Sequence, residues 1–336
     1  MIARSSALVA GLAAAVAVAI VARLLSSVLP AALSEVLVAV LLGILVANGG
    51  LLPAGAAPGL RFAVQRVLRL GIILLGARLS LGDVAQTGVG ALGLVLAMMT
   101  VAFSFAILAG RIAALPRRLA ILIGVGTAVC GNSAIIATAP VIDAEDREVS
   151  FAVATITLFG TLAVFLYPLV GHALALASPV FGVWAGVAVN DTSQVVAASA
   201  AYSPEARDVA TVVKLVRNTL MAPLIVLIAW WWGRYGTVRR DEVRAGALRA
   251  FPLFVLGFLF MALLRTAGAI DRGLAAPIDE VAKACILVAL AGVGLSTRVA
   301  QMRTVGPRPF YVGFGTAVLM AGLSLAAIVR LGIAPR

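Results

Sequence analysis

Two polar, helix-breaking clusters stand in the middle of strongly apolar stretches: Cys130-Gly131-Asn132-Ser133 and Asn190-Asp191-Thr192-Ser193-Gln194. The first lies within residues 118–142 and the second within residues 179–201. In a bilayer every backbone amide and carbonyl needs a partner inside the protein, so polar breaks at mid-depth persist where they are buried or line a wet cavity. Such breaks are the usual form of a transporter's binding site.

The composition is that of a membrane protein. Of 336 residues, 62% are hydrophobic and 12% are charged, against about 45–50% and about 25% in a soluble domain. The chain is therefore predicted to be an all-α polytopic membrane protein. Its net charge of +12 comes from arginines in short loops, which is the positive-inside pattern of membrane proteins and not that of a nucleic-acid-binding protein.

Eleven transmembrane helices are predicted, at about 20 residues for each span. They cover residues 6–24, 32–47, 62–79, 84–109, 118–142, 151–170, 179–201, 205–232, 251–264, 278–295 and 310–331.

Loop charge predicts a cytoplasmic N terminus and a C terminus outside, because short-loop arginines remain in the cytoplasm. The arginines placed there are Arg4, Arg61, Arg66, Arg69, Arg111, Arg117, Arg118, Arg234, Arg239, Arg240, Arg244, Arg249, Arg298, Arg303 and Arg308. The acids placed outside are Asp143, Glu145, Asp146, Glu148, Glu205, Asp208, Asp271, Asp279 and Glu280.

An internal repeat is predicted from two matched blocks. Residues 67–70 and 75–79 match residues 212–215 and 220–224 at one offset of 145, with Arg69 and Lys214 in the same place. The chain would then be a single transporter domain, residues 1–336, with an extra first helix, a five-helix repeat over 32–171 and its inverted copy over 179–331. The repeat pairs the fifth span with the tenth, where residues 291–296 would form a further helix break. Chance similarity between apolar strings is the alternative.

Gly131, Asn132 and Ser133 are candidate substrate ligands. Asn132 and Ser133 are good N-cap residues, so a half-helix starting there would present free amides and a positive dipole end at mid-membrane, which suits an anion. The alternative is a glycine-rich packing face, with Ser133 bonded back to its own helix.

The second cluster is predicted to be another wall of the site. Asn190, Thr192, Ser193 and Gln194 would bind substrate, while Asp191, which costs a few kcal/mol if charged at the bilayer centre, would carry a coupling proton or ion. Residues 182–189 and 195–200 are each too short to span alone, which favours one broken span or a re-entrant pair. An external loop between two short helices is the alternative.

Lys214, Arg217 and Asn218 in the eighth span complete the candidate site. Lys214 and Arg217 share a helix face and need a partner in the bilayer, either Asp191 or an anionic substrate held by the guanidinium. Alternatively the helix begins near Lys214 and both cations lie at the interface.

Several kinds of chemistry find no matching pattern. With one histidine and two distant cysteines, Cys130 and Cys285, there is no metal site. No phosphate-binding GxxxxGK[ST] loop and no nucleophile–base pair stand out. The chain is therefore expected not to be an enzyme and to need no cofactor.

Residues 70–80, 130–135, 190–198 and 214–218 resemble motifs of the YeiH-like family of bacterial inner-membrane proteins, which carries the label of sulfate exporters. The resemblance runs from about residue 41 to residue 295. The family is similar to the bile acid/sodium symporter-like superfamily, whose inverted five-helix repeats carry crossed broken helices. The resemblance thus implies discontinuous helices and a multi-pass location in the inner (plasma) membrane.

The leading functional prediction is a secondary transporter of a small anion, such as sulfate or an organic sulfonate or carboxylate, working by alternating access. The anion would lie between the two clusters, with Lys214 and Arg217 balancing its charge. A passive anion channel is the second hypothesis and an intramembrane enzyme the third. The expected partners are the anion and the lipid bilayer, and a homodimer is left open.

Overall fold

The computed structural model describes residues 2–28, 35–53, 55–232, 253–298, 300 and 306–333. These residues form helices and, among them, no strand, which confirms the all-α prediction. The predicted starts of the second and ninth spans, residues 32 and 251, lie outside the described residues. So do six arginines of the predicted cytoplasmic loops: Arg234, Arg239, Arg240, Arg244, Arg249 and Arg303.

Five described helical stretches are long and apolar enough to cross a bilayer: Ala7–Ser26, Leu81–Ile112, Asp146–Ala173, Pro204–Trp232 and Pro307–Leu331. Shorter apolar helices accompany them at Glu35–Asn48, Asn132–Ile142, Ser178–Ala188 and Phe254–Thr266. A bilayer core of about 30 Å requires about 20 helical residues. The chain is therefore a multi-pass membrane protein in which several apolar helices are too short to cross alone.

The helices group into two compact units. Unit 1 comprises Met1–Ala85, Ala200–Ser203 and Leu253–Ala300, and unit 2 comprises Gln86–Ser199, Pro204–Pro252 and Gln301–Arg336. The helices of unit 1 are α1 (Ile2–Ser26), α2 (Glu35–Asn48), α3 (Ala57–Phe62), η1 (Ala63–Val67), α4 (Leu68–Leu75), η2 (Gly76–Arg78), α14 (Phe254–Thr266) and α15 (Arg272–Ser296).

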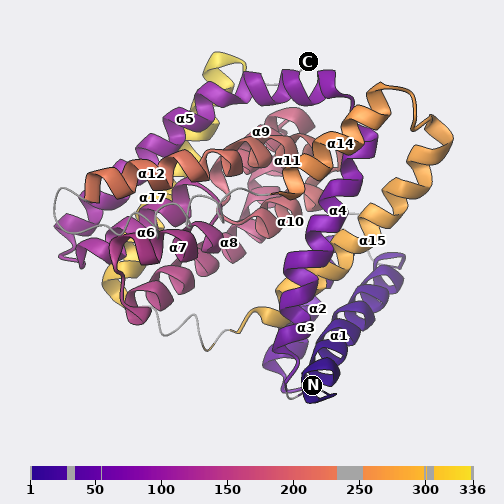
Figure 1. Ribbon diagram of the computed structural model, residues 1–336, viewed down its shortest axis with the longest axis horizontal. Coiled ribbons are helices and arrows are strands. Elements are labelled where there is room, and N and C mark those ends of the chain that lie inside the picture. Colours follow the sequence, from indigo (N-terminus) through magenta and orange to yellow (C-terminus); the bar gives the residue numbers. More distant parts are fainter. Residues whose placement is uncertain are drawn as a thin grey trace. The chain divides into compact units, whose positions relative to one another are not determined.

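Within unit 1, α15 packs against α2 and α4 (Figure 1). The predicted break at residues 291–296 is wrong, because α15 is continuous from Arg272 to Ser296. Its glycines serve close packing: a methyl group on Gly294 would lie 2.3 Å from the carbonyl oxygen of Val40, and one on Gly43 would lie 2.7 Å from that of Ala291. Small residues let membrane helices approach in this way without any break.

Unit 2 contains most of α5 (Leu81–Ile112) and the elements that surround both polar clusters. These are α6 (Arg117–Ala128), α7 (Asn132–Thr138), η3 (Ala139–Ile142), α8 (Asp146–Ala173), α9 (Ser178–Ala188), α10 (Thr192–Tyr202), α11 (Pro204–Thr219), α12 (Met221–Trp232) and α17 (Pro307–Leu331). Both predicted breaks are therefore confirmed, at residues 129–131 and 189–191.

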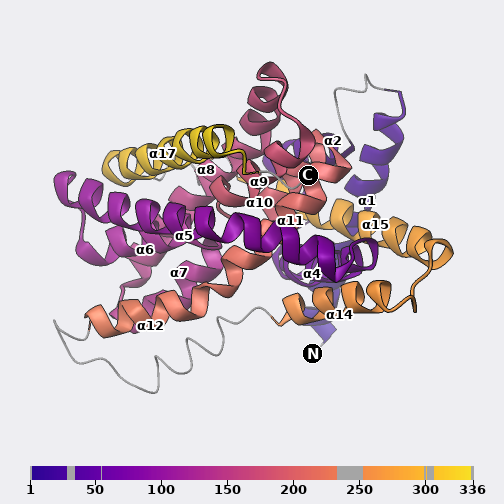
Figure 2. The same ribbon diagram turned by 90° about the horizontal axis from the view of Figure 1, so that it is seen from above.

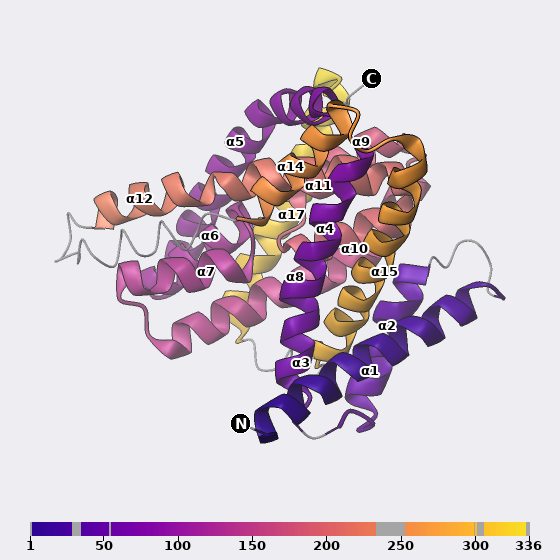
Figure 3. The same ribbon diagram turned by 45° about the vertical axis from the view of Figure 1, so that its right-hand side comes forward.

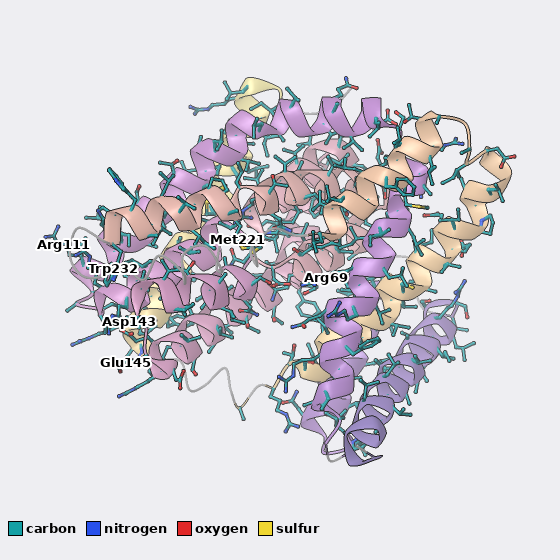
Figure 4. All side chains as sticks on the ribbon, viewed as in Figure 1. Arg69, Arg111, Asp143, Glu145, Met221 and Trp232 are labelled. Carbon is teal, nitrogen blue, oxygen red and sulfur yellow. The ribbon has the colours of Figure 1, made fainter. Side chains whose placement is uncertain are left out.

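The first break is the tip of a re-entrant hairpin, hairpin 1, made of α6, α7 and η3. The chain turns back at the tip, so that a methyl group on Gly126 in α6 would lie 2.9 Å from Ile135 in α7. Figure 3 draws α6 beside α7, which pack against each other. In Figure 4 Arg111, Trp232, Asp143 and Glu145 all lie at the left-hand end, whereas Met221 lies further inward. The chain therefore enters and leaves hairpin 1 at the same end of unit 2.

The second break is the tip of hairpin 2, made of α9 and α10. Helix α11 follows α10 yet runs parallel to α9: a methyl group on Gly182 would meet the carbonyl oxygen of Ala206 at 2.7 Å, and one on Gly186 would meet that of Ala210 at 2.9 Å. Since contacts advance in the same direction along both helices, α10 has to return to the side where α9 began. The re-entrant alternative is therefore correct for residues 179–201.

Three long elements enclose the hairpins. Helix α8 packs against both arms of hairpin 1, and α17 packs against α8 and α9 (Figure 2). The α11–α12 rod starts at the base of hairpin 2 and ends at the base of hairpin 1, where Arg117 lies 4.6 Å from the Trp231 ring. The first arm of each hairpin, α6 or α9, is buried along residues 119–128 or 181–188. The backbone groups where these arms end are therefore shielded from lipid, as the bilayer requires.

Candidate functional site

The two hairpin tips meet inside unit 2. Gly131 takes φ +64°, a left-handed conformation that favours glycine. A methyl group on Gly131 would lie 3.1 Å from Asp191 Oδ2 and 3.2 Å from Asp191 Cα. The absence of a side chain at Gly131 therefore lets hairpin 1 touch hairpin 2, and the two predicted clusters form one polar centre.

The first tip differs in detail from the prediction. Gly131, and not Asn132 or Ser133, is the N-cap residue of α7, and no side chain caps this helix. The chain reverses so tightly that the Gly131 N–H donates to the Gly126 carbonyl at 2.9 Å. Asn132 Nδ2 donates to Thr157 Oγ1 of α8 at 3.3 Å, while Ser133 is exposed.

The second tip is organised by Asp191. Its Oδ1 accepts hydrogen bonds from the Ser193 N–H at 2.9 Å and the Ser193 hydroxyl at 2.7 Å, so it caps the start of α10. The Asp191 N–H donates to Gln194 Oε1 at 3.3 Å. Gln194 fills a notch at Gly160 of α8, where a methyl group would lie 1.8 Å from Oε1. Thr157 and Gly160 thus join the site without any signal in the sequence that singles them out.

Lys214 joins the two tips through their backbone. Its Nζ donates to the carbonyl of Val129 in the first tip at 2.7 Å and to that of Val189 in the second at 3.1 Å. A third, short bond goes to the carbonyl of Asn190. The side chain has no exposed surface.

Arg217 makes a second bridge one turn further along α11. Its guanidinium donates to Thr127 and Ala128 at the end of α6, and to Val187 and Val189 at the end of α9, both within 2.8 Å. Cations at helix C-terminal ends interact favourably with the helix dipole. The side chain is 1% exposed.

These contacts correct two sequence-based interpretations. The interfacial alternative is wrong, because α11 begins at Pro204 and both side chains are buried. The expected partner, Asp191 or a clamped anion, is replaced by backbone carbonyls of α6 and α9. Lys214 and Arg217 hold the tips together and have few donors left for direct contact with a substrate.

The remaining predicted residue, Asn218, also reaches the centre: its Nδ2 donates to Thr192 Oγ1 at 3.1 Å. Three amide oxygens there, on Asn132, Asn190 and Asn218, are buried without a hydrogen-bond partner. All eleven predicted site residues therefore belong to the two tips or to α11 beside them. Sequence reasoning missed the carbonyls of residues 127–129 and 187–190, which are the groups that the buried cations bind.

A neighbouring pair of sulfur atoms completes the centre. Cys130 Sγ lies 3.1 Å from Met221 Sδ, where α11 passes into α12. Among the residues that the structure describes, no group of three or more His, Cys, Asp or Glu side chains could hold a metal ion. The centre is thus a polar cluster of hydroxyl, amide and carbonyl groups with one acid and two cations.

Comparison with known proteins places the chain among membrane proteins. The family model described as conserved hypothetical protein 698 matches residues 10–313. The UPF0324 membrane protein of Clostridium tetani is 32% identical over 287 residues, which cover 82% of this chain and 83% of the relative. The UPF0324 membrane protein TauZ of Paracoccus pantotrophus is 34% identical over 279 residues, 82% of each chain. No solved structure matches. The resemblance seen in the motifs is confirmed at this level, and the chain belongs to the UPF0324 family of membrane proteins.

Proposed function

We propose that the protein is a secondary transporter of a small anion, working by alternating access in the bacterial inner membrane. One observation carries the proposal: two opposed re-entrant hairpins bring their tips together around buried charges. Helix breaks that meet away from both surfaces are the form that substrate sites of secondary transporters take. Movement of one helix bundle against another would expose the tips to each side of the membrane in turn.

The sign of the charge supports an anion. Lys214 and Arg217 contribute two positive charges and Asp191 one negative charge. Two helix C-terminal ends and two N-terminal ends meet here, and their opposite half charges cancel. The centre therefore keeps about one positive charge, which is costly at low dielectric and which a bound anion would neutralise.

Direct contacts to the anion would come from the less buried groups. Ser133 is exposed, and Asn132, Asp191 and Thr192 are half-buried. The hydroxyls of Ser133 and Thr192 can donate hydrogen bonds. The side-chain amide of Asn132 can do so as well. The Thr157 hydroxyl can accept from its Nδ2 or, with the amide turned over, donate to its Oδ1, and an N–H of Asn132 is then available to the anion. Asp191 would carry the coupling proton.

Uptake of radiolabelled sulfate, a sulfonate and a carboxylate into liposomes containing the purified protein tests the proposal. We expect saturable uptake and counterflow, a loss of at least about tenfold in uptake rate for Ser133→Ala, and loss of pH-gradient coupling for Asp191→Asn. Thr100→Ala, on an exposed face of α5, is the control. Unsaturable, voltage-driven flux would instead identify a channel, and normal coupled transport by both variants would refute the site.

A further inference from the structure

We propose that the two hairpin tips form a binding site for a monovalent cation, which the ammonium group of Lys214 occupies permanently. The chain would thus supply this cation from its own side chain and need no Na⁺ or K⁺ at this position. This inference concerns the tips alone and does not depend on the proposed transport function.

The ligands of this site are all backbone carbonyl oxygens. Lys214 Nζ contacts those of Val129, Val189 and Asn190, and the two with ordinary distances lie at 2.7 and 3.1 Å. Three acceptors match the three N–H donors of an ammonium group. Among the described residues, no carboxylate forms an ion pair with Lys214, so the direct ligands of its ammonium group are carbonyl oxygens, as those of a bound cation would be.

The origin of the oxygens explains why a cation belongs there. Val129 follows the last residue of α6, and Val189 follows the last residue of α9, so each carbonyl lies at a negative helix end. Unwound carbonyls at the ends of half-helices are the groups that coordinate small cations in transporters. Without a cation, the buried carbonyl oxygens of Val129 and Asn190 would lose the donor that Lys214 supplies.

Arg217 does not make this position redundant. Its guanidinium binds Thr127, Ala128 and Val187, one or two residues earlier in each helix, and shares only Val189 with Lys214. The planar guanidinium spans these four carbonyls and that of Gly186 at 3.5 Å, whereas the ammonium occupies a position of the size of a small ion. Removing the Lys214 side chain should therefore leave a vacant cation site.

Chemical rescue of Lys214→Ala tests this inference. The side chain removed by the substitution corresponds to n-propylamine, so n-propylammonium, ammonium and Na⁺ are each added to the full-length protein in detergent, against choline at constant ionic strength. Thermal unfolding is followed by intrinsic tryptophan fluorescence. Lys214→Met fills the space with an apolar chain, and Lys283→Ala removes a lysine that pairs with Asp279 and Glu280.

We expect n-propylammonium, and more weakly ammonium and Na⁺, to raise the melting temperature of Lys214→Ala. A cation at 30 times its dissociation constant should raise it by about 3 °C. Neutral 1-propanol should have no such effect, and neither Lys214→Met nor Lys283→Ala should respond to n-propylammonium beyond choline.

The opposite result is equally clear. If the melting temperature of Lys214→Ala is the same in all cations, the carbonyls do not form a cation site and the proposal is overturned. If the variant is not recovered in choline, the yield of monodisperse protein solubilised in each cation is measured instead. An equally low yield in every cation would also overturn the proposal.

Discussion

Replacing Arg217 by methionine should destabilise the junction of the two tips more than any other single change that keeps side-chain volume. The substitution removes the donors to four buried carbonyls, on Thr127, Ala128, Val187 and Val189. At about 1–1.5 kcal/mol net for each hydrogen bond, unfolding should become easier by about 4–6 kcal/mol. For a chain of 336 residues, the melting temperature should fall by about 6–9 °C.

Arg217→Lys separates charge from geometry. An ammonium keeps the positive charge but offers three N–H donors from one point, so it cannot reach both pairs of carbonyls at once. We expect about half of the loss seen for Arg217→Met. Arg111→Met, at the exposed end of α5, should shift the free energy of unfolding by less than about 0.5 kcal/mol.

The chain provides its own reporter for this measurement. Cys130 lies in the first tip and is 5% exposed, so in a Cys285→Ala background a thiol-reactive dye reports the opening of the tip during a thermal ramp. Arg217→Met should react at a lower temperature than Arg217→Lys, and both at a lower temperature than Arg111→Met. Equal labelling curves for Arg217→Met and Arg111→Met would show that the carbonyl contacts do not hold the tips.

Two further predictions concern the hairpins. A single cysteine at Glu145 in spheroplasts should be labelled from the same side of the membrane as one at Arg111, because both ends of hairpin 1 lie together; labelling from opposite sides would restore the eleven-span topology. Gly131→Ala should lower the free energy of unfolding by about 2–3 kcal/mol, from its left-handed φ and its contact with Asp191. Gly90→Ala, where a methyl group meets open space, should cost nothing, and equal melting curves for the two would contradict the tip contact.

The positions of both breaks could be predicted from sequence because their causes are local. Polar residues and Gly131 interrupt apolar runs, and short polar side chains and glycine disfavour a continuous helix where they cluster. The direction of the chain after each break has no local cause. It depends on tertiary contacts, and for hairpin 2 it follows from the contacts of Gly182 and Gly186 of α9 with α11, which runs parallel to α9. A broken span and a re-entrant pair of helices therefore have the same sequence pattern.

The two hairpins change the predicted membrane topology but leave the predicted sides of the two chain termini unchanged. Each replaces one predicted crossing by none, so the direction of α8 between them reverses while the later segments keep their predicted sides. The acidic segment that contains Asp143 and Glu145 moves to the side that holds Arg111 (Figure 4). Because Asp and Glu contribute little to membrane orientation, this placement is compatible with the arginine pattern that predicted a cytoplasmic N terminus.

The matched positions Arg69 and Lys214 show where a sequence repeat stops predicting function. Lys214 is fully buried and bound to three carbonyls, whereas Arg69 is exposed and lies 5.6 Å from the Phe254 ring. The difference follows from what each helix faces. Helix α11 passes two hairpin tips with unpaired carbonyls, while α4 packs against α15, whose backbone is continuous and needs no external donor. The inverted repeat stays a prediction. Even with such a repeat, Lys214 would have its role only because the carbonyls of the two hairpin tips lie beside it. The chemistry of the site therefore depends on the tips and not on the repeated motif.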